Sequence, residues 1–449
     1  METAKEFTAN KAESGSGSSR LPAVSLPKGG GAIRGIGEKF AANPVTGTGS
    51  MSVPIFTSPG RSGFGPQLSL SYDSGSGNGP FGFGWSLSLP SITRKTDKGL
   101  PQYRDSEDSD EFLLSGAEDL VPVLVQDGDE WKREDLPPRI VDGRSYRVEC
   151  YRPRIEGLFA RIERWTNLSN LTDVCWRSIS RDNITTWYGR TENSRIFDPD
   201  DHSHIFSWLI CESYDDKGNA VVYEYVPEDS QRVDASQANE ANRTEASRAA
   251  NRYIKSIKYG NRTPNRDPQW QGTDPATLPK DNWMFEVVFD YGEGHYEELP
   301  LDAQQRQFVK ARKDPDLAKP WPVRQDPFSS YRAGFEVRTY RLCRRVLMFH
   351  HFPDQLGTPD YLVRSTEFSY SESPIASFIT SATQSGYVRQ GDGTYLKKCL
   401  PPLEFGYTEA VINESSRRST PRAWKTCPPA WMAQVTSGST STGRASPAS

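Results

Sequence analysis

Cysteine is scarce in this chain of 449 residues, and its six copies lie far apart without a CxxC pair. This spacing excludes a zinc knuckle and does not indicate a disulfide scaffold. We therefore expect free thiols, made in a reducing compartment, at the following positions: Cys150, Cys175, Cys211, Cys343, Cys399 and Cys427.

Long hydrophobic runs are also missing. Residues 1–20 are mostly Ser, Gly, Lys and Glu, so they lack the apolar core of a Sec signal peptide, and we predict a disordered leader there. No later run is long enough to span a bilayer. The formal net charge of -4 gives no electrostatic case for nucleic-acid binding.

Aromatic residues and turn formers are abundant instead. The chain has 11 Trp, 19 Tyr and 20 Phe, although hydrophobic residues make up only 35% of it, and 36 Gly and 33 Pro interrupt it often. Such a composition favours many short strands over long helices. The sequence therefore predicts a mainly β fold, a large antiparallel assembly of hairpins and meanders.

The clearest strand pattern lies between residues 53 and 89. Residues 67–72 alternate apolar and small polar side chains, residues 73–80 are rich in Gly, Ser and Asn, and residues 81–89 alternate again. This order predicts two strands joined by a turn, with Phe81, Phe83 and Trp85 on one buried face. Residues 53–56 are predicted to add a third strand, and Pro54 argues that it lies at an edge.

Further along, strand patterns follow one another closely. We predict a meander over residues 146–188, and a hairpin in which residues 205–214 and 220–225 flank the turn Asp215-Asp216-Lys217-Gly218-Asn219. The order Tyr-Asp-x-x-Gly-Asn, strand, Tyr also resembles the repeat core of RHS and YD-repeat proteins. Residues 335–352 alternate apolar side chains with arginines. This pattern predicts a late strand with one apolar face and one solvated face that carries the arginines.

Two segments differ from this β pattern. Residues 228–252 are dominated by Ala, Asn, Glu, Gln and Arg, which predicts a polar helical or loop insert. Residues 410–449 end in Ser, Thr, Gly and Ala without a period, which predicts an unstructured tail.

Several segments together resemble the SpvB-type N-terminal domain of the B component of bacterial insecticidal Tc toxin complexes. The resemblance covers roughly residues 21–409 and rests on Leu-Pro-Lys-Gly-Gly-Gly-Ala-Ile at 26–33, Gly-Pro-Phe-Gly-Phe-Gly-Trp-Ser-Leu at 79–87, residues 335–352, Ser-Phe-Ile-Thr-Ser at 377–381 and Gly-Tyr-Val-Arg at 386–389. After Glu409 the chain departs from the family, which continues into a β-propeller.

The resemblance implies a structural toxin subunit rather than an enzyme. In that family the B component and the C component, an RHS-repeat toxin, build a hollow shell around the toxic part of C, and the propeller of B docks on the pore-forming A component. This implies a wall segment with the C component as partner. It also implies synthesis in the bacterial cytoplasm and a later extracellular location, without nucleic-acid binding or membrane insertion by this chain.

A relative in the SpvB family carries a C-terminal ADP-ribosyltransferase whose signature includes Glu-x-Glu. No Glu-x-Glu is present here, and Ser365-Thr366-Glu367 lacks the rest of that constellation. We therefore predict no catalytic residues and no cofactor site. The glycines at residues 29–37 match neither GxGxxG nor GxxxxGK[ST], and no GxSxG elbow is present.

Metal binding has one weak candidate. His202 and His204 lie among Asp198, Asp200 and Asp201, but a polar loop between strands explains these residues better. The acidic run 105–111 lacks the ligand spacing of a calcium loop and is read as a solvated turn. His350 and His351 are adjacent in a predicted strand, so they point to opposite faces and cannot share a ligand. We predict no metal site.

Two other functions stay open on the sequence. RHS-like hairpins also occur in cell-surface proteins, so a surface or adhesion module is one alternative. The other is the remnant of an SpvB-like ADP-ribosyltransferase without its catalytic domain.

Overall fold

The computed structural model describes residues 38–42, 47–116, 118–134, 136–141, 143–265, 282–316 and 318–408. Of these, 5% are helical and 49% lie in strands, which confirms the mainly β prediction. The chain divides into two compact units, residues 1–404 and 405–449, and the first unit contains all the elements described below. The predicted leader (1–20), the glycine-rich segment (29–37) and the predicted tail (410–449) lie outside the described residues.

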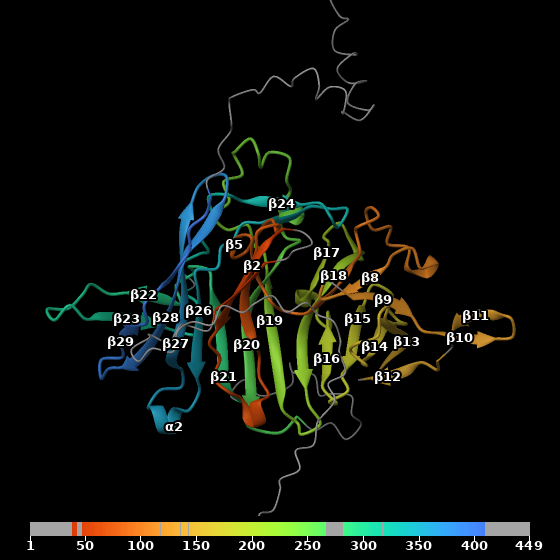
Figure 1. The fold of residues 1–449 in the computed structure, drawn as a ribbon, viewed down its shortest axis with the longest axis horizontal. Helices are drawn as coiled ribbons and strands as arrows, with labels where there is room; N and C mark the ends of the chain where they lie inside the picture. The colour runs from red at the N-terminus through yellow and green to blue at the C-terminus, as the bar shows by residue number, and fades with distance from the viewer. Residues whose placement is uncertain are drawn as a thin grey trace, which may run out of the picture. The chain divides into compact units, whose positions relative to one another are not determined.

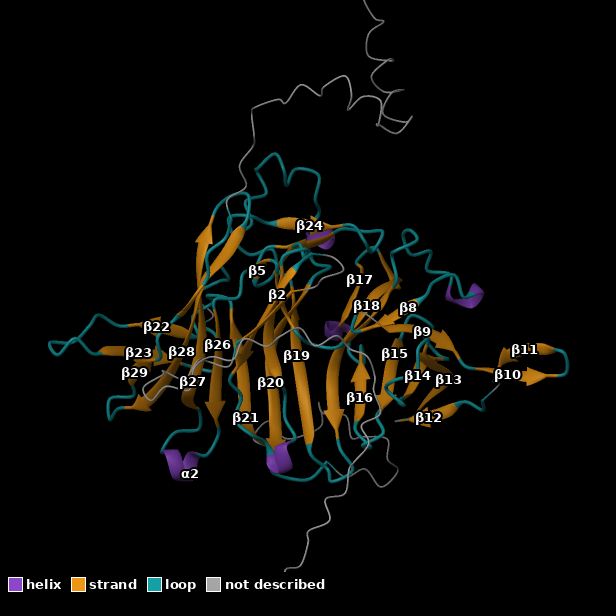
Figure 2. Cartoon of the chain, in the orientation of Figure 1, coloured by secondary structure: helices purple, strands orange, loops and turns teal. Residues whose placement is uncertain are grey.

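Twenty strands form the largest sheet, in which all pairings are antiparallel (Figures 1 and 2). They are β7 (Ser91–Arg94), β8 (Phe112–Leu114), β9 (Glu118–Pro122), β12 (Arg139–Val141), β13 (Arg144–Pro153), β14 (Arg161–Asn167), β15 (Val174–Ile179), β16 (Thr185–Tyr188), β17 (Arg195–Asp198), β18 (Asp201–Tyr214), β19 (Ala220–Pro227), β20 (Arg252–Asn261), β21 (Trp283–Asp290), β22 (Tyr296–Glu298), β23 (Gln307–Ala311), β26 (Arg345–His350), β27 (Tyr361–Glu372), β28 (Ser377–Arg389), β29 (Tyr395–Cys399) and β30 (Leu403–Glu404).

Smaller elements surround this sheet. They are a four-stranded sheet of β1 (Lys39–Ala42), β2 (Gly49–Ile55), β3 (Leu68–Asp73) and β6 (Trp85–Leu87); the pairs β4 (Asn78–Gly79) with β5 (Gly82–Phe83), β10 (Leu124–Asp127) with β11 (Glu130–Arg133), and β24 (Phe328–Ser330) with β25 (Val337–Thr339); the short helices α1 (Glu245–Arg248) and α2 (Pro353–Leu356); and the 3-10 turns η1 (Arg61–Gly63), η2 (Asp105–Glu107) and η3 (Glu192–Ser194).

One end of the large sheet closes on itself. Strand β18 pairs with β7 and with β16, and the path from β7 through β8, β9, β13, β14 and β15 returns to β16. The result is a ring of eight antiparallel strands. The predicted meander over residues 146–188 is confirmed as β13–β16, and the predicted hairpin across Asp215 is confirmed as β18 and β19.

Aromatic side chains fill the interior of this ring. Phe112, Trp176 and Trp208 meet edge to face, with ring centroids 4.9 to 6.0 Å apart, and all three are buried. The indole N–H of Trp208 donates to the Val174 carbonyl at 2.8 Å, so its one polar group is satisfied. Gly189 has a φ of +64°, and a Cβ there would lie 2.3 Å from Trp208, so only glycine admits this indole.

The opposite end of the sheet curls around a second core. Strands β21, β26, β27, β28, β29, β23 and β22 follow one another by pairing. Their buried residues form a cluster of Val288, Tyr296, Val309, Leu347, Phe349, Leu362, Tyr387 and Tyr395. The large sheet therefore carries one apolar core inside the ring and another inside this curl.

The four-stranded sheet packs on the middle of the large one. The Tyr259 hydroxyl in β20 donates to the Ser58 carbonyl at 2.6 Å, and Gln384 in β28 donates to the Pro54 carbonyl at 3.3 Å. Strand β2 lies between β1 and β3, so the prediction of an edge strand is wrong. Within the described residues β1 pairs with β2 only as far as Ser52, so Pro54 has a partner on one side alone, Ser69 of β3, and is tolerated there.

The predicted strand over residues 335–352 is interrupted. Strand β25 pairs with β24 only, β26 belongs to the large sheet, and residues 340–344 between them are not in a strand. The predicted solvated face is also wrong, because Arg338 and Arg341 are buried. Each has a carboxylate partner from residues 228–252: Glu240 pairs with Arg338 and Glu228 pairs with Arg341.

Candidate functional site: an aromatic pocket beneath a glycine-rich hairpin

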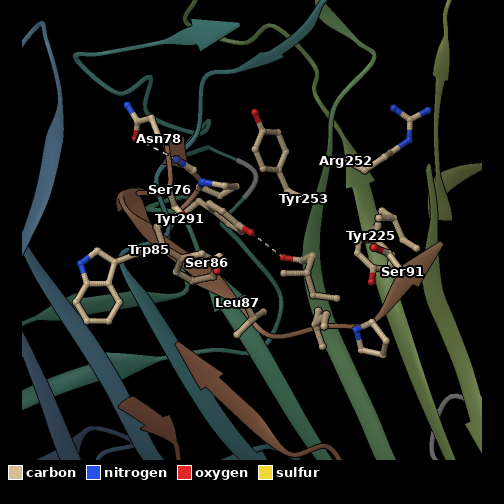
Figure 3. A pocket seen from close by; sticks show the side chains of 18 residues that line it. Ser76, Asn78, Trp85, Ser86, Leu87, Ser91, Tyr225, Arg252, Tyr253 and Tyr291 are labelled. Carbon is tan, nitrogen blue, oxygen red and sulfur yellow. Dashed lines mark hydrogen bonds between the residues drawn. The ribbon is translucent and has the colours of Figure 1, made fainter. Parts of the chain in front are cut away.

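A cavity of about 380 Å³ lies between the segment that carries β4–β6 and strands β18–β20. Its lining residues are Ser76, Gly77, Asn78, Gly79, Pro80, Phe81, Trp85, Ser86, Leu87, Leu89, Pro90, Ser91, Leu209, Tyr225, Arg252, Tyr253, Ile254 and Tyr291. Figure 3 shows Trp85 on one side of this pocket, and Tyr225 and Arg252 on the other. A pocket of this size and mainly apolar lining is typical of ligand sites.

The hairpin wall is built by residues that the sequence singled out. Phe81 and Trp85 are 3% and 2% exposed, and Phe83 is half-buried, so the prediction that these aromatics face a core is confirmed. Strand β3 pairs with β6 as predicted, with Tyr72 opposite Trp85. The return arm is not one continuous strand, however, since β5 pairs with β4 inside the predicted turn.

Two glycines explain why the return arm is interrupted and why it packs closely on β28. Gly82 and Gly84 have φ values of +89° and +80°, which L side chains rarely adopt. A Cβ on Gly82 would lie 2.6 Å from the Ser377 carbonyl oxygen, so the hairpin touches β28 through bare backbone. Phe81 then meets Phe368 edge to face at 6.1 Å, and Phe83 lies 5.6 Å from Phe378.

Tyrosines line the side of the pocket that the large sheet forms, and two of their hydroxyls are hydrogen-bonded. Tyr253 and Tyr291 pack with ring centroids 5.6 Å apart. The Tyr291 hydroxyl donates to the Ile254 carbonyl at 3.0 Å, as Figure 3 shows, and the Tyr253 hydroxyl accepts the Tyr340 N–H at 3.0 Å. Burial raises the pKa of both hydroxyls well above the ordinary value, so both stay protonated.

The acidic run that the sequence placed in solvent binds buried arginines instead. Asp105 accepts from Arg94 at 2.6 and 2.9 Å and is paired with Arg164, and Asp110 accepts from Arg94 at 2.7 Å. Burial alone would raise the pKa of Asp105, but the two arginines outweigh it and lower that pKa. The prediction of a solvated turn is therefore wrong for Asp105 and Asp110, because Arg94 is buried against the aromatic core of the ring and needs a counter-charge. It is confirmed for residues 106–108, which are exposed.

The histidine candidates His202 and His204 lie in strand β18, so the prediction of a polar loop is wrong, and they do not converge on one point. The ring of His202 lies 4.5 Å from Phe197, whereas His204 stacks on Tyr103 at 4.4 Å and lies 3.4 and 3.8 Å from two separate carboxylates. Across residues 38–408, apart from the gaps given above, no group of three His, Cys, Asp or Glu side chains is placed to hold a metal ion. In the same ranges no helix is long and apolar enough to cross a membrane.

His350 and His351 contact different groups, and His351 lies just beyond the end of β26. His350 Nε2 lies 2.6 Å from the Ser58 hydroxyl, on the face that the four-stranded sheet covers. His351 lies between Asp360 at 2.9 Å and Glu286 at 3.1 Å. Burial alone would lower the pKa of His351, but its two carboxylate partners raise it to about 9.

The cysteines are free thiols at the five described positions, as expected, and Cys427 lies outside them. Burial raises the pKa of Cys175 to about 11 and that of Cys211 to about 12, so neither is a reactive thiolate at neutral pH.

The sequence did not identify Tyr225 and Arg252 as pocket residues. Tyr225 was assigned to the return strand of a hairpin, and Arg252 was the last residue of the polar insert. Their meeting with the 76–91 segment depends on long-range packing, for which the sequence carries no local signal.

The comparisons with known proteins agree on one family. The family described as SpvB, "Salmonella virulence plasmid 65kDa B protein", matches residues 43–352. The chain is 40% identical over 378 residues to "Mono(ADP-ribosyl)transferase SpvB" of Salmonella choleraesuis (strain SC-B67), and the match covers 82% of this chain. The chain spans only 57% of the length of that relative.

Solved structures give the same result. The N-terminal domain of the effector protein SpvB from Salmonella typhimurium strain LT2 matches with a TM-score of 0.63 at 40% identity, over 75% of this chain and 98% of that one. TcdB2-TccC3 matches with a TM-score of 0.68 at 34% identity, over 86% of this chain and 17% of that one. The Photorhabdus luminescens Tc holotoxin pore also matches, with a TM-score of 0.68 at 33% identity. Because the family model matches residues 43–352 and the SpvB N-terminal domain is 40% identical over 75% of the chain, this chain belongs to the SpvB family.

Proposed function

We propose that this chain is a structural subunit of a toxin complex and forms part of the wall of a shell. In this proposal the shell encloses the toxic part of a Tc-type C component and delivers it through the pore of an A component. Docking on the A component is assigned to the propeller of the B component and not to this segment. The chain is made in the bacterial cytoplasm and acts outside the cell.

One observation carries the proposal. The match to TcdB2-TccC3 covers 86% of this chain but only 17% of that one, at 34% identity. The chain therefore corresponds to one segment of a much larger toxin polypeptide. The continuous antiparallel sheet supports the proposal, because such a sheet suits a partition better than a catalytic cleft.

A chimera tests the wall role directly. The matching segment of TcdB2 is replaced by residues 38–408 of this chain, the chimera is expressed with TccC3, and the purified particle is imaged by electron microscopy. We expect a hollow particle that still retains the C-terminal part of TccC3. A matched chimera carrying Gly82→Trp, which blocks the contact of the hairpin with β28, should fail to close. Particles without an enclosed volume in the unaltered chimera would refute the wall role.

An enzymatic role is the second candidate, because the matched relatives are named mono(ADP-ribosyl)transferases. The match covers 98% of the solved N-terminal domain and 57% of the whole relative, and this chain has no Glu-x-Glu. We propose that it has no transferase activity. Incubation of the purified chain with labelled NAD and actin should give no labelled actin, and labelling would overturn the proposal.

A further inference from the structure

Arg252 is the cationic residue of the aromatic pocket. One terminal nitrogen, Nη1, donates to the backbone carbonyls of Ala249, Ala250 and Asn251, at 2.7, 3.2 and 3.1 Å. Its Nε is buried and has no hydrogen-bond partner among the described residues. Burial lowers the pKa of Arg252, and only the distant charge of the exposed Glu192 opposes this. The guanidinium lies over the ring of Phe197, 5.0 Å from its centroid, and no carboxylate of the described residues forms an ion pair with it.

Arg252 is partly buried, and the fully buried arginines of the described residues differ from it. Each has a carboxylate oxygen within 3.3 Å, and they are Arg94, Arg164, Arg177, Arg195, Arg248, Arg324, Arg338 and Arg341. A buried charge without a partner is costly, so proteins normally supply one. Arg252, although only partly buried, has no carboxylate partner among the described residues, so an anionic ligand in the pocket would supply one.

Tyr225 offers a second open polar group in the same wall. It is largely buried, and its hydroxyl makes no hydrogen bond to any described residue. Its strand, β19, pairs with β20, which begins at Arg252. Figure 3 places both side chains on the same side of the pocket, across from Trp85. A hydroxyl donor and a guanidinium donor therefore line one side, and aromatic surface lines the other.

We propose that this pocket binds a carboxylate that carries an aromatic ring. The ring packs against Trp85, Tyr253 and Tyr291, and the carboxylate accepts hydrogen bonds from Arg252 Nε and the Tyr225 hydroxyl. Arginine suits this role because its guanidinium binds carboxylates through directed, charge-assisted hydrogen bonds. A free arylalkanoate and the C-terminal phenylalanine of a polypeptide share this chemistry.

Two pairs of probes test the proposal by titration calorimetry with the full chain. 3-Phenylpropionate and its neutral amide test a free acid, and N-acetylphenylalanine and its neutral amide test a polypeptide C-terminus. We expect each acid to bind about tenfold more tightly than its amide, because only the acid makes charge-assisted bonds. The pair with the tighter acid identifies the source. The preference should fall as salt rises, because Arg252 is only partly buried.

Variants assign the effect to the pocket. Arg252→Met should abolish the preference for the acid, and Arg252→Lys should retain part of it. Tyr225→Phe removes only the hydroxyl and should weaken acid binding several-fold while leaving the amide unchanged. Circular dichroism checks the fold of each variant. If Arg252→Met does not fold, Tyr225→Phe and the salt titration still test whether the acid binds in this pocket.

Three results would overturn the proposal. The first is equal binding of acid and amide in the unaltered chain. The second is acid binding that neither Arg252→Lys nor Tyr225→Phe changes. The third is no detectable binding of either acid at concentrations up to about 10 mM, where even a weak ligand of this size should bind.

Discussion

The ion pair between Glu228 and Arg341 gives the sharpest stability prediction. Neither side chain has any solvent exposure, and Arg341 Nε donates to the two oxygens of Glu228 at 3.0 and 2.9 Å. Replacing Glu228 by Gln keeps the size of the side chain but removes its charge. The one carboxylate that Arg341 then retains among the described residues is the partly exposed Asp229, at 3.0 Å, beside backbone carbonyls.

Breaking one side of a buried ion pair costs about 3–5 kcal/mol. Because Asp229 remains and a glutamine oxygen still accepts one hydrogen bond, we expect Glu228→Gln to lose about 3 kcal/mol of unfolding free energy. The double variant Glu228→Leu with Arg341→Met should lose less than the two single changes added together, since no unpaired charge stays buried.

Urea unfolding followed by tryptophan fluorescence measures these free energies, with the slope m checked for each variant. Glu245→Gln is the matched control. Glu245 pairs with Arg248 at 3.3 Å, but its side chain is 79% exposed, so the change should cost less than about 0.5 kcal/mol. A Glu228→Gln protein as stable as this control would refute the idea that buried ion pairs hold residues 228–252 in place.

Three further predictions follow from the site and the fold. His351→Gln should lower the unfolding free energy by about 2–3 kcal/mol at pH 6. Because the pKa of His351 in the folded protein is raised to about 9, this difference should shrink as the pH rises from about 6.5 through 9. A difference that does not depend on pH would contradict this prediction. Asp105→Asn should be destabilising at pH 7 and less so at pH 3, because the lowered pKa of Asp105 gives stability that is lost as the pH falls, which acid unfolding measures. Gly82→Ala should lower the thermal stability clearly more than Gly63→Ala, because both glycines have positive φ but only a Cβ at residue 82 would meet backbone atoms. Equal losses of thermal stability would argue against the close contact with β28.

Local patterns predicted local structure well. The alternation over residues 146–188 became β13–β16, and the Asp215 turn formed as expected because Asp215 itself accepts the N–H groups of Lys217 and Asn219. These predictions depend on neighbours in sequence, and residue type is sufficient for them.

The long-range ion pairs could not be predicted from the sequence. Arg338 and Arg341 alternate with apolar residues as solvent-facing residues do, yet their partners lie about a hundred residues earlier in the chain. The spacing of residues along the sequence does not indicate which glutamate forms an ion pair with which arginine. The same limit applies to the aromatic pocket, whose two walls come from residues 76–91 and from β18–β20.

The eight-stranded ring has a consequence for assembly. Strands of the ring pair on both sides and offer little unpaired backbone to a neighbouring chain, and the edges left beside the ring in the described residues are the short strands β12, paired with β13 alone, and β17, paired with β18 alone. At the far side, β22 pairs with β23 alone within the described part of the chain, and its tip carries the exposed Glu297 and Glu298. Strand addition is therefore confined to these short edges and to β22, where the carboxylates of Glu297 and Glu298 disfavour an added strand.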